Sequence, residues 1–190
     1  MKATNPGGSL VEMTQCYIKI GNTRPIYMKV LPEISDSKRA TYTDESVIGR
    51  AFPMKTYSHS DNRVITWTIH FVASSGKELD ENIDRLRLIE SAVYPRRPKN
   101  LFPYQPPPIC QLKCGMTLAE TPLCAILENY SVKFPTDVAW SNSKAPNEAT
   151  SGPEKFMPYK FDVDLSFHVV YDSNNLPSHE DMLPGSERLM

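Results

Sequence analysis

Residues 159–171 carry the most constraining pattern in this chain, a strict alternation of apolar and polar side chains. One parity holds Phe161, Val163, Leu165, Phe167, Val169 and Tyr171, and the other holds Lys160, Asp162, Asp164, Ser166 and His168. Because successive side chains of a β-strand point to opposite faces of its sheet, this pattern predicts a strand with one apolar and one polar face. A strand of about 12 residues is roughly twice the usual length, which indicates a large or shared sheet.

Several other segments also predict strands. Residues 63–73 place Ile65, Trp67, Ile69, Phe71 and Ala73 on one parity. Residues 123–134 alternate Cys124, Ile126, Glu128, Tyr130, Val132 and Phe134 with Ala125, Leu127, Asn129, Ser131 and Lys133. Residues 10–20 and 26–31, joined by a Gly-Asn turn, indicate a hairpin, and residues 46–52 and 109–114 are shorter candidates. Since a long polar loop, residues 135–158, separates the two longest strands, we expect those strands to pair antiparallel.

The remaining polar segments predict connections and ends. Residues 1–9 are small and polar and predict a flexible N-terminal arm. Residues 32–45 have little pattern and predict an exposed loop, either a simple surface connection or a partner-binding insertion. Residues 172–190 form a polar C-terminal tail that is either disordered or ordered by docking onto another subunit. Residues 10–171 are then expected to form a single domain.

Only one segment, about 76–94, predicts a substantial helix. Ser75 and Glu78 have the spacing of a capping box, in which each side chain accepts a hydrogen bond from a free backbone N–H of the first turn. The apolar stripe consists of Leu79, Ile83, Leu86, Ile89 and Val93. Such a stripe is expected to lie across the sheet and cover its apolar face, with a partner-binding helix as the alternative. The Pro-rich residues 95–108 then predict an extended crossover, or else a ligand for an SH3-type domain.

Charge and hydropathy narrow the function classes. The chain has 21 Lys and Arg against 22 Asp and Glu, a net charge of −1, which gives no reason to expect binding to a nucleic acid backbone. No apolar run reaches the roughly 18 residues of a membrane span, and the first residues lack the apolar segment of a signal peptide. We therefore expect synthesis in a reducing cytoplasm and no contact with a membrane.

The four cysteines are expected to be free thiols rather than metal ligands. Cys110 and Cys114 are separated by three residues, which is the wrong spacing for the usual zinc pair. On a strand, residues four apart share a face but lie roughly 13 Å from each other, too far to bridge or to share a metal. Cys16 and Cys124 are expected to be free as well.

The sequence offers no catalytic or cofactor-binding motif. Ser58, His59 and Asp61 resemble a hydrolase set, but they are nearly contiguous, and a catalytic triad needs members that converge in space. A polar turn is the preferred interpretation. The histidines at 59, 70, 168 and 179 show no metal-ligand spacing, and there is no Gly-rich phosphate loop. We expect a protein that is not an enzyme and has no cofactor.

The order of elements over residues 65–171 resembles a known family. A strand with Trp67, Ile69 and Phe71 precedes a capped helix ending at 93–95, a Pro-rich link ending at 107–108 and a strand ending at 114–115. Two hydrophobic patterns follow. One consists of Leu127, Tyr130, Ser131 and Val132, and the other of Pro158, Phe161, Val163, Leu165 and Phe167. This succession resembles the tail-tube and tube-initiator (baseplate hub) proteins of contractile-tailed bacteriophages and related contractile injection systems.

The resemblance implies a mainly β fold of the α+β type, an antiparallel β-sandwich or split barrel with one flanking amphipathic helix. It also implies a homohexameric ring in the virion, in which long strands join edge to edge around a lumen for DNA. The adjacent tail-tube and baseplate hub or wedge proteins would be its partners. The candidate inter-subunit strand residues are Phe161, Val163, Leu165 and Phe167. Asp162 and Asp164 are the candidate lumen residues, where negative charge would keep DNA from sticking, or else ordinary solvent-facing acids.

A different class of function stays open beside this one. A β-sandwich can also be a non-catalytic module that binds a carbohydrate-type ligand. Such a module presents an exposed aromatic platform, and the loose candidates here are Tyr57, Tyr104 and Trp140.

Overall fold

The computed structural model describes residues 12–46, 48–97, 104–118, 121–141, 156–172 and 176–178. The predicted N-terminal arm, most of the C-terminal tail and residues 142–155 of the long loop lie outside this part of the chain. The strands are β1 (Met13–Ile20), β2 (Ile26–Met28), β3 (Glu33–Ser37), β4 (Ala40–Glu45), β5 (Met54–Ser60), β6 (Val64–Val72), β7 (Cys110–Cys114), β8 (Leu123–Lys133), β9 (Trp140–Ser141), β10 (Met157–Pro158) and β11 (Lys160–Val169). The helices are α1 (Gly76–Ser91) and the four-residue α2 (Gly115–Leu118).

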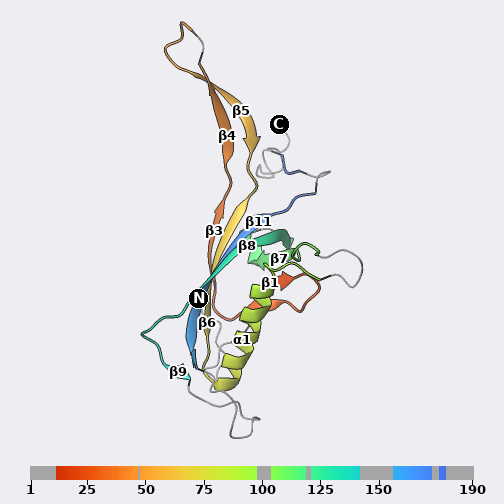
Figure 1. The fold of residues 1–190 in the computed structure, drawn as a ribbon, viewed down its shortest axis with the longest axis vertical. Helices are drawn as coiled ribbons and strands as arrows, with labels where there is room; N and C mark the ends of the chain where they lie inside the picture. Colours follow the sequence, from red (N-terminus) through yellow and green to blue (C-terminus); the bar gives the residue numbers. More distant parts are fainter. Residues whose placement is uncertain are drawn as a thin grey trace.

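Seven of these strands form one antiparallel sheet in the order β2-β1-β7-β8-β11-β6-β3 (Figure 1). The two longest predicted strands, β8 and β11, pair antiparallel as expected. The fold is therefore mainly β with one substantial helix. Within the described residues the outer strands β2 and β3 do not pair with each other, so the sheet stays open rather than closing into a barrel.

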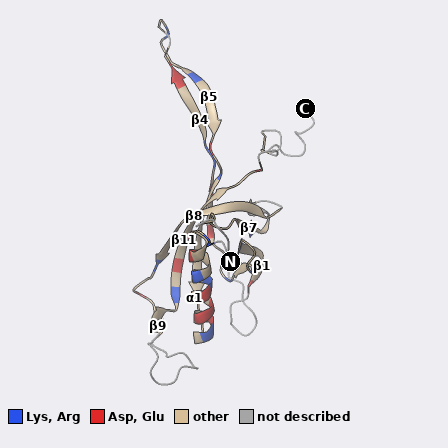
Figure 2. Ribbon diagram, turned by 45° about the vertical axis from the view of Figure 1, so that its right-hand side comes forward, with Lys and Arg blue, Asp and Glu red and all other residues tan. Residues whose placement is uncertain are grey.

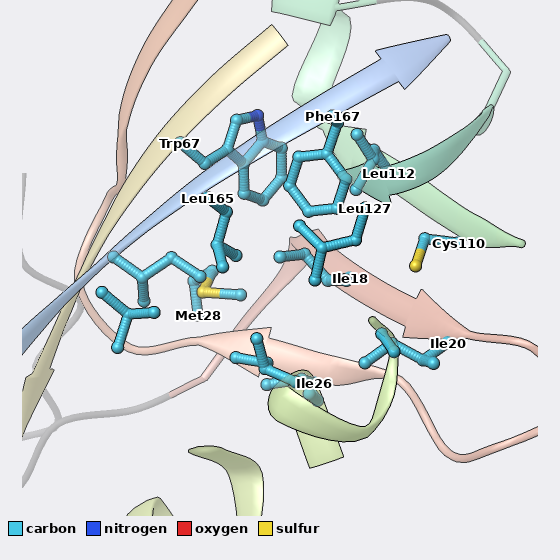
Figure 3. Close-up of a cluster of buried hydrophobic side chains, with 14 of the residues drawn as sticks. Ile18, Ile20, Ile26, Met28, Trp67, Cys110, Leu112, Leu127, Leu165 and Phe167 are labelled. Carbon is cyan, nitrogen blue, oxygen red and sulfur yellow. The ribbon is translucent and has the colours of Figure 1, made fainter. Parts of the chain in front are cut away.

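The core lies on one face of this sheet, because the sheet curls until β1 and β2 face β6 and β11 (Figure 3). Trp67, Leu165 and Phe167 point across the core toward Ile18 and Met28. The alternation predicted for β11 is confirmed, since its five apolar residues from Phe161 to Val169 are 2% exposed or less. Burying one large apolar side chain contributes about 1.5–3 kcal/mol, so this layer accounts for much of the stability of the fold.

Helix α1 packs beside this core as its apolar stripe predicted. Leu79, Leu86 and Ile89 are buried, and the amide of Asn82 donates to the carbonyl oxygen of Val72 at 3.2 Å. The cap differs in one detail from the prediction. Ser75 accepts from the N–H of Glu78 at 3.3 Å, but Glu78 accepts from the N–H and hydroxyl of Ser74 rather than from Ser75.

The secondary structure predicted for residues 32–62 was wrong, although the exposure predicted for 32–45 is largely confirmed. The predicted loop at 32–45 contains β3 and β4, the predicted strand at 46–52 lies at the turn, and the predicted polar turn around 58–62 begins within β5. Strand β4 pairs with β5 and β3 pairs with β6, so residues 33–72 form one long hairpin whose outer half projects from the molecule (Figure 1). Every residue of β5 is exposed, and so is nearly all of β4. With neither face buried, these strands carry no apolar alternation to detect.

The unbroken alternation predicted for residues 123–134 was wrong, because β8 contains an irregularity. Its register with β11 shifts between Ser166 and Phe167, where Glu128 is an extra residue in β8. A β-bulge of this kind reverses the parity of the residues beyond it. Ala125 and Leu127 therefore point into the core on one side of the bulge, as Tyr130 and Val132 do on the other.

Candidate assembly interface

The polar face of β11 is organised by hydrogen bonds and ion pairs to its two neighbours. On the β6 side, Asp162 lies 2.7 Å from Nδ1 of His70, and the hydroxyl of Thr68 donates to Asp164 at 2.7 Å. On the β8 side, Nζ of Lys133 lies 2.6 Å from Oδ2 of Asp164. Both aspartates are half-buried on the face opposite the core, so they are not core residues.

The electrostatics of this face differ from a simple negative surface. The ammonium of Lys133 and the hydroxyl of Thr68 hold the pKa of Asp164 below its usual value. Asp164 in turn raises the pKa of Lys133, so both groups are charged at neutral pH. Farther along the face, Nε2 of His168 lies 2.6 Å from a carboxylate oxygen of Glu128. Each of the acids Glu128, Asp162 and Asp164 therefore contacts a hydroxyl, ammonium or imidazole group on a neighbouring strand.

The structure places the candidate inter-subunit residues inside one chain. Phe161, Val163, Leu165 and Phe167 are between 0% and 2% exposed. Both edges of β11 are already hydrogen-bonded, to β6 on one side and to β8 on the other. An edge-to-edge joint between subunits therefore has to use other strands than β11.

Among the described residues, two strand edges near β11 are open, and the outer side of β2 at the far end of the sheet is open as well. Strand β7 pairs with β8 only as far as Ala125, so residues 126–133 of β8 have a strand partner on the β11 side alone. At the other end, β3 pairs with β6 and has no strand on its outer side. The four strands β8, β11, β6 and β3 thus form a layer with an apolar face, a polar face and an open edge at each end. Sequence reasoning missed both edges, because the pairing partners are distant in sequence.

The projecting hairpin of β4 and β5 is a second candidate surface. Tyr42 and Tyr57 are each 55% exposed, and their rings meet edge to face with centroids 5.8 Å apart. Toward the turn, Phe52 is 82% exposed and Ile48 is fully exposed. A two-stranded ribbon is marginally stable by itself in water, and exposed aromatic side chains are enriched where proteins meet.

Ser58, His59 and Asp61 come closer together than expected from a polar turn. Oγ of Ser58 lies 3.1 Å from Nδ1 of His59, and Nε2 of His59 lies 3.1 Å from Oδ1 of Asp61. All three belong to the base of the projecting hairpin, where the side chains of His59 and Asp61 are 61% and 43% exposed. Water competes for these hydrogen bonds, and the surroundings supply no desolvated pocket for a nucleophile.

The aromatic residues considered for a ligand platform are scattered. Tyr57 belongs to β5 and Trp140 to β9, which lie at opposite ends of the molecule (Figure 1). Trp140 stacks on Phe156 with ring centroids 4.7 Å apart, and Tyr104 is exposed in the Pro-rich segment. The three side chains therefore do not form one platform.

Two of the open grooves that border α1 have volumes above about 500 Å³, and the exposed side of the helix carries both acidic and basic residues (Figure 2). One, of about 510 Å³, has Asp84, Arg87 and Phe156 in its lining. The other, of about 800 Å³, lies at the end of α1 near Tyr94 and Cys124. The first lining mixes acidic residues with Arg87, whereas Arg96 is the one charged residue in the second, and neither set of groups specifies a ligand class.

The described residues contain no group of three or more His, Cys, Asp or Glu placed to hold a metal ion. No helix in that part of the chain is long and apolar enough to span a membrane. Comparisons of the sequence with models of known protein families and with curated proteins found no match.

Proposed function

We propose that this protein is a structural component of a phage tail, a baseplate hub or tube-initiator ring that continues into the tail tube. Its partners are then further copies of itself and the adjacent tube and baseplate proteins. The observation that carries the proposal is the four-stranded layer of β8, β11, β6 and β3, whose two outer edges are open.

Open strand edges favour association because their N–H and C=O groups are ready to pair with another strand. A joint between the β8 edge of one copy and the β3 edge of the next is heterologous, and repeating it generates a ring wherever the rotation closes. In a closed ring the split sheet of each chain becomes part of one continuous barrel. The family resemblance supplies the expected number of six copies.

The polar face of the same layer would then line the lumen. Asp162 and Asp164 lie on that face, as a lumen role requires. Because Nζ of Lys133 lies 2.6 Å from Asp164 and the ring of His70 lies 2.7 Å from Asp162, the face is not a uniformly negative surface. A channel wall of this kind suits passage without binding.

The projecting hairpin supplies a contact of a different kind. It continues β3 and β6 beyond the end of the layer (Figure 1). Its length and its exposed aromatic residues suit contact with the adjacent ring of the tube or baseplate rather than with the next copy in the same ring. The ring joint and the stacking contact would therefore rest on separate parts of residues 33–133.

Electron microscopy of the particle that carries this protein in its native source tests the proposal. Copies are counted, and the chain is fitted into a reconstruction. We expect six copies in a ring at the junction of tube and baseplate, with the polar face of β11 toward the channel. A protein that sediments only as a free monomer and is absent from every particle would overturn the proposal. The isolated protein is a poorer test, because an initiator ring can require its template to form.

A further inference from the structure

Two cysteines that lie 98 positions apart in the sequence meet across neighbouring strands. Cys16 on β1 is the direct cross-strand partner of Cys114 on β7. Their sulfur atoms lie 3.2 Å apart, and the residues are only 3% and 5% exposed. The two thiols therefore form an isolated pair within the apolar core.

The register of this pair gives the two backbones a spacing that a disulfide can span. Directly opposed residues of antiparallel strands have Cα atoms about 4.5–5.5 Å apart, inside the span of about 4.4–6.8 Å that disulfides use. A sulfur–sulfur bond of about 2.0 Å requires the sulfurs to approach by roughly 1 Å. We expect rotation of the two side chains to supply most of that movement.

We propose that Cys16 and Cys114 are a redox-responsive pair that closes to an intramolecular disulfide when the protein meets a two-electron oxidant of the peroxide class. One thiol attacks a peroxide oxygen, which breaks the O–O bond, gives a sulfenic acid and releases the first water. The second thiol then attacks the sulfenic sulfur, which forms the S–S bond and releases the second water. Two thiols and one hydrogen peroxide thus give one disulfide and two water molecules.

The other two cysteines have no thiol opposite them. Cys110 pairs with Ile20 and Ala125, and Cys124 pairs with Gln111. Cys110 is fully buried, whereas Cys124 is exposed on the outer face. The pair is thus specific, and Cys110 and Cys124 provide matched controls within the same sheet.

Burial controls the rate of this chemistry. Burial raises the pKa of Cys16, and so does the neighbouring thiol of Cys114, which makes the reactive thiolate rare at neutral pH. Oxidation is therefore expected to be slow and to need transient opening of β1 from β7. The same shielding would protect the completed bond from dissolved thiols.

The bond would fasten the first described strand to the middle of the sheet. Closing so long a segment restricts the unfolded chain strongly, so the oxidised form is expected to be the more stable one. A protein made in a reducing cytoplasm would keep the dithiol and acquire the bond after release into an oxidising medium. This inference does not depend on ring formation.

The test treats the purified full-length protein with hydrogen peroxide and follows it by intact mass and by peptide mapping without reduction. We expect a loss of about 2 Da, a cross-linked peptide that contains Cys16 and Cys114, and a rise of about 5 °C or more in the thermal unfolding midpoint. Cys124→Ser and Cys110→Ala should still form the bond, whereas Cys16→Ala and Cys114→Ala should not.

Peptide mapping of the unsubstituted protein decides the outcome even where a cysteine variant fails to fold. Sulfinic or sulfonic acid on Cys16 or Cys114 without a cross-link would overturn the proposal. A cross-link that joins Cys124 of two molecules in place of the internal pair would overturn it as well, and so would two thiols that remain reduced after transient unfolding in the presence of peroxide.

Discussion

Lys133 and Asp164 form an ion pair across strands β8 and β11, with Nζ 2.6 Å from Oδ2, on the face of the sheet opposite the core. The side chain of Asp164 is 32% exposed, whereas Leu165, the next residue in the chain, is 2% exposed. Adjacent residues of one strand thus belong to two different environments. Their substitutions should separate the stability of the subunit from the role of its polar face.

The first prediction compares these two faces. The double substitution Asp162→Asn and Asp164→Asn should lower the urea midpoint of the isolated protein far less than a core substitution, because asparagine keeps the size and one acceptor oxygen of each aspartate, and ion pairs that reach water contribute about 1 kcal/mol or less. Leu165→Ala is the control and should cost about 2–5 kcal/mol, because it leaves a cavity in the core. Urea unfolding followed by tryptophan fluorescence measures both. An equally large loss for the asparagine variant would show that the polar face is a structural element of the monomer.

The second prediction concerns the open edge of β8. Successive backbone N–H groups of a strand point to opposite sides, so one of the two residues Ser131 and Val132 directs its N–H toward β11 and the other directs it outward. Proline at the residue whose N–H points toward β11 removes a hydrogen bond within the subunit and should destabilise the fold. Proline at the residue whose N–H points outward should leave a folded subunit that fails to enter particles.

Complementation of particles that lack the native protein, with circular dichroism of each purified variant, checks this expectation. The matched controls are Ser131→Ala and Val132→Ala, which keep the backbone N–H that proline removes at each position. One of the two proline variants, Ser131→Pro or Val132→Pro, is expected to fold. If that variant assembles as well as the unsubstituted protein, β8 is not the ring joint.

The third prediction removes the projecting hairpin. Residues 41–59 are replaced by Asn-Gly, which favours a tight turn between Ala40 and Ser60. Since this segment is almost entirely exposed, the thermal midpoint should change little while incorporation into particles is lost. The milder control, Tyr42→Ala with Tyr57→Ala, keeps the ribbon and removes its aromatic pair. Normal incorporation of the shortened protein would show that the hairpin makes no essential contact.

The fourth prediction is a pH dependence centred on Glu78 at the start of α1. Hydrogen bonds from Ser74 and the nearby ammonium of Lys29, 3.1 Å away, lower the pKa of Glu78 to about 2. Because the folded pKa lies below the unfolded one, the ionised carboxylate stabilises the fold fully above about pH 4.5, and this stabilisation is lost as the pH falls toward 2.

The variant Glu78→Gln tests this dependence. It should be less stable than the unsubstituted protein at pH 7, and the difference should shrink steadily between about pH 4.5 and pH 2. Urea unfolding at five pH values measures it, with Glu81→Gln on the exposed side of the same helix as the control. A difference that stays constant over this range would mean that the charge of Glu78 does not stabilise the fold.

These sites also show where sequence reasoning succeeds. Strands β6 and β11 and helix α1 each bury one face, so their hydrophobic period is visible and their predictions were confirmed. Strands β4 and β5 bury neither face, so their sequences lack the alternation of apolar and polar residues from which a strand is predicted. The pairing of Asp162 with His70 and of Cys16 with Cys114 joins residues more than 90 positions apart, which a single sequence does not reveal.

The last prediction follows from the bulge in β8. Ala125 and Leu127 point inward before Glu128, and Tyr130 and Val132 point inward after it, so Glu128 is the one residue outside the alternation. Deleting Glu128 should give a regular ladder with β11 in which every inward residue keeps its place. The deletion loses only the ion pair with His168 and should fold with nearly normal stability. Deleting Ser131 is the control, because it turns the residues beyond it to the wrong face and should unfold the protein. Thermal unfolding of both variants measures the contrast, and equal damage from the two deletions would mean that the bulge itself is required by the fold.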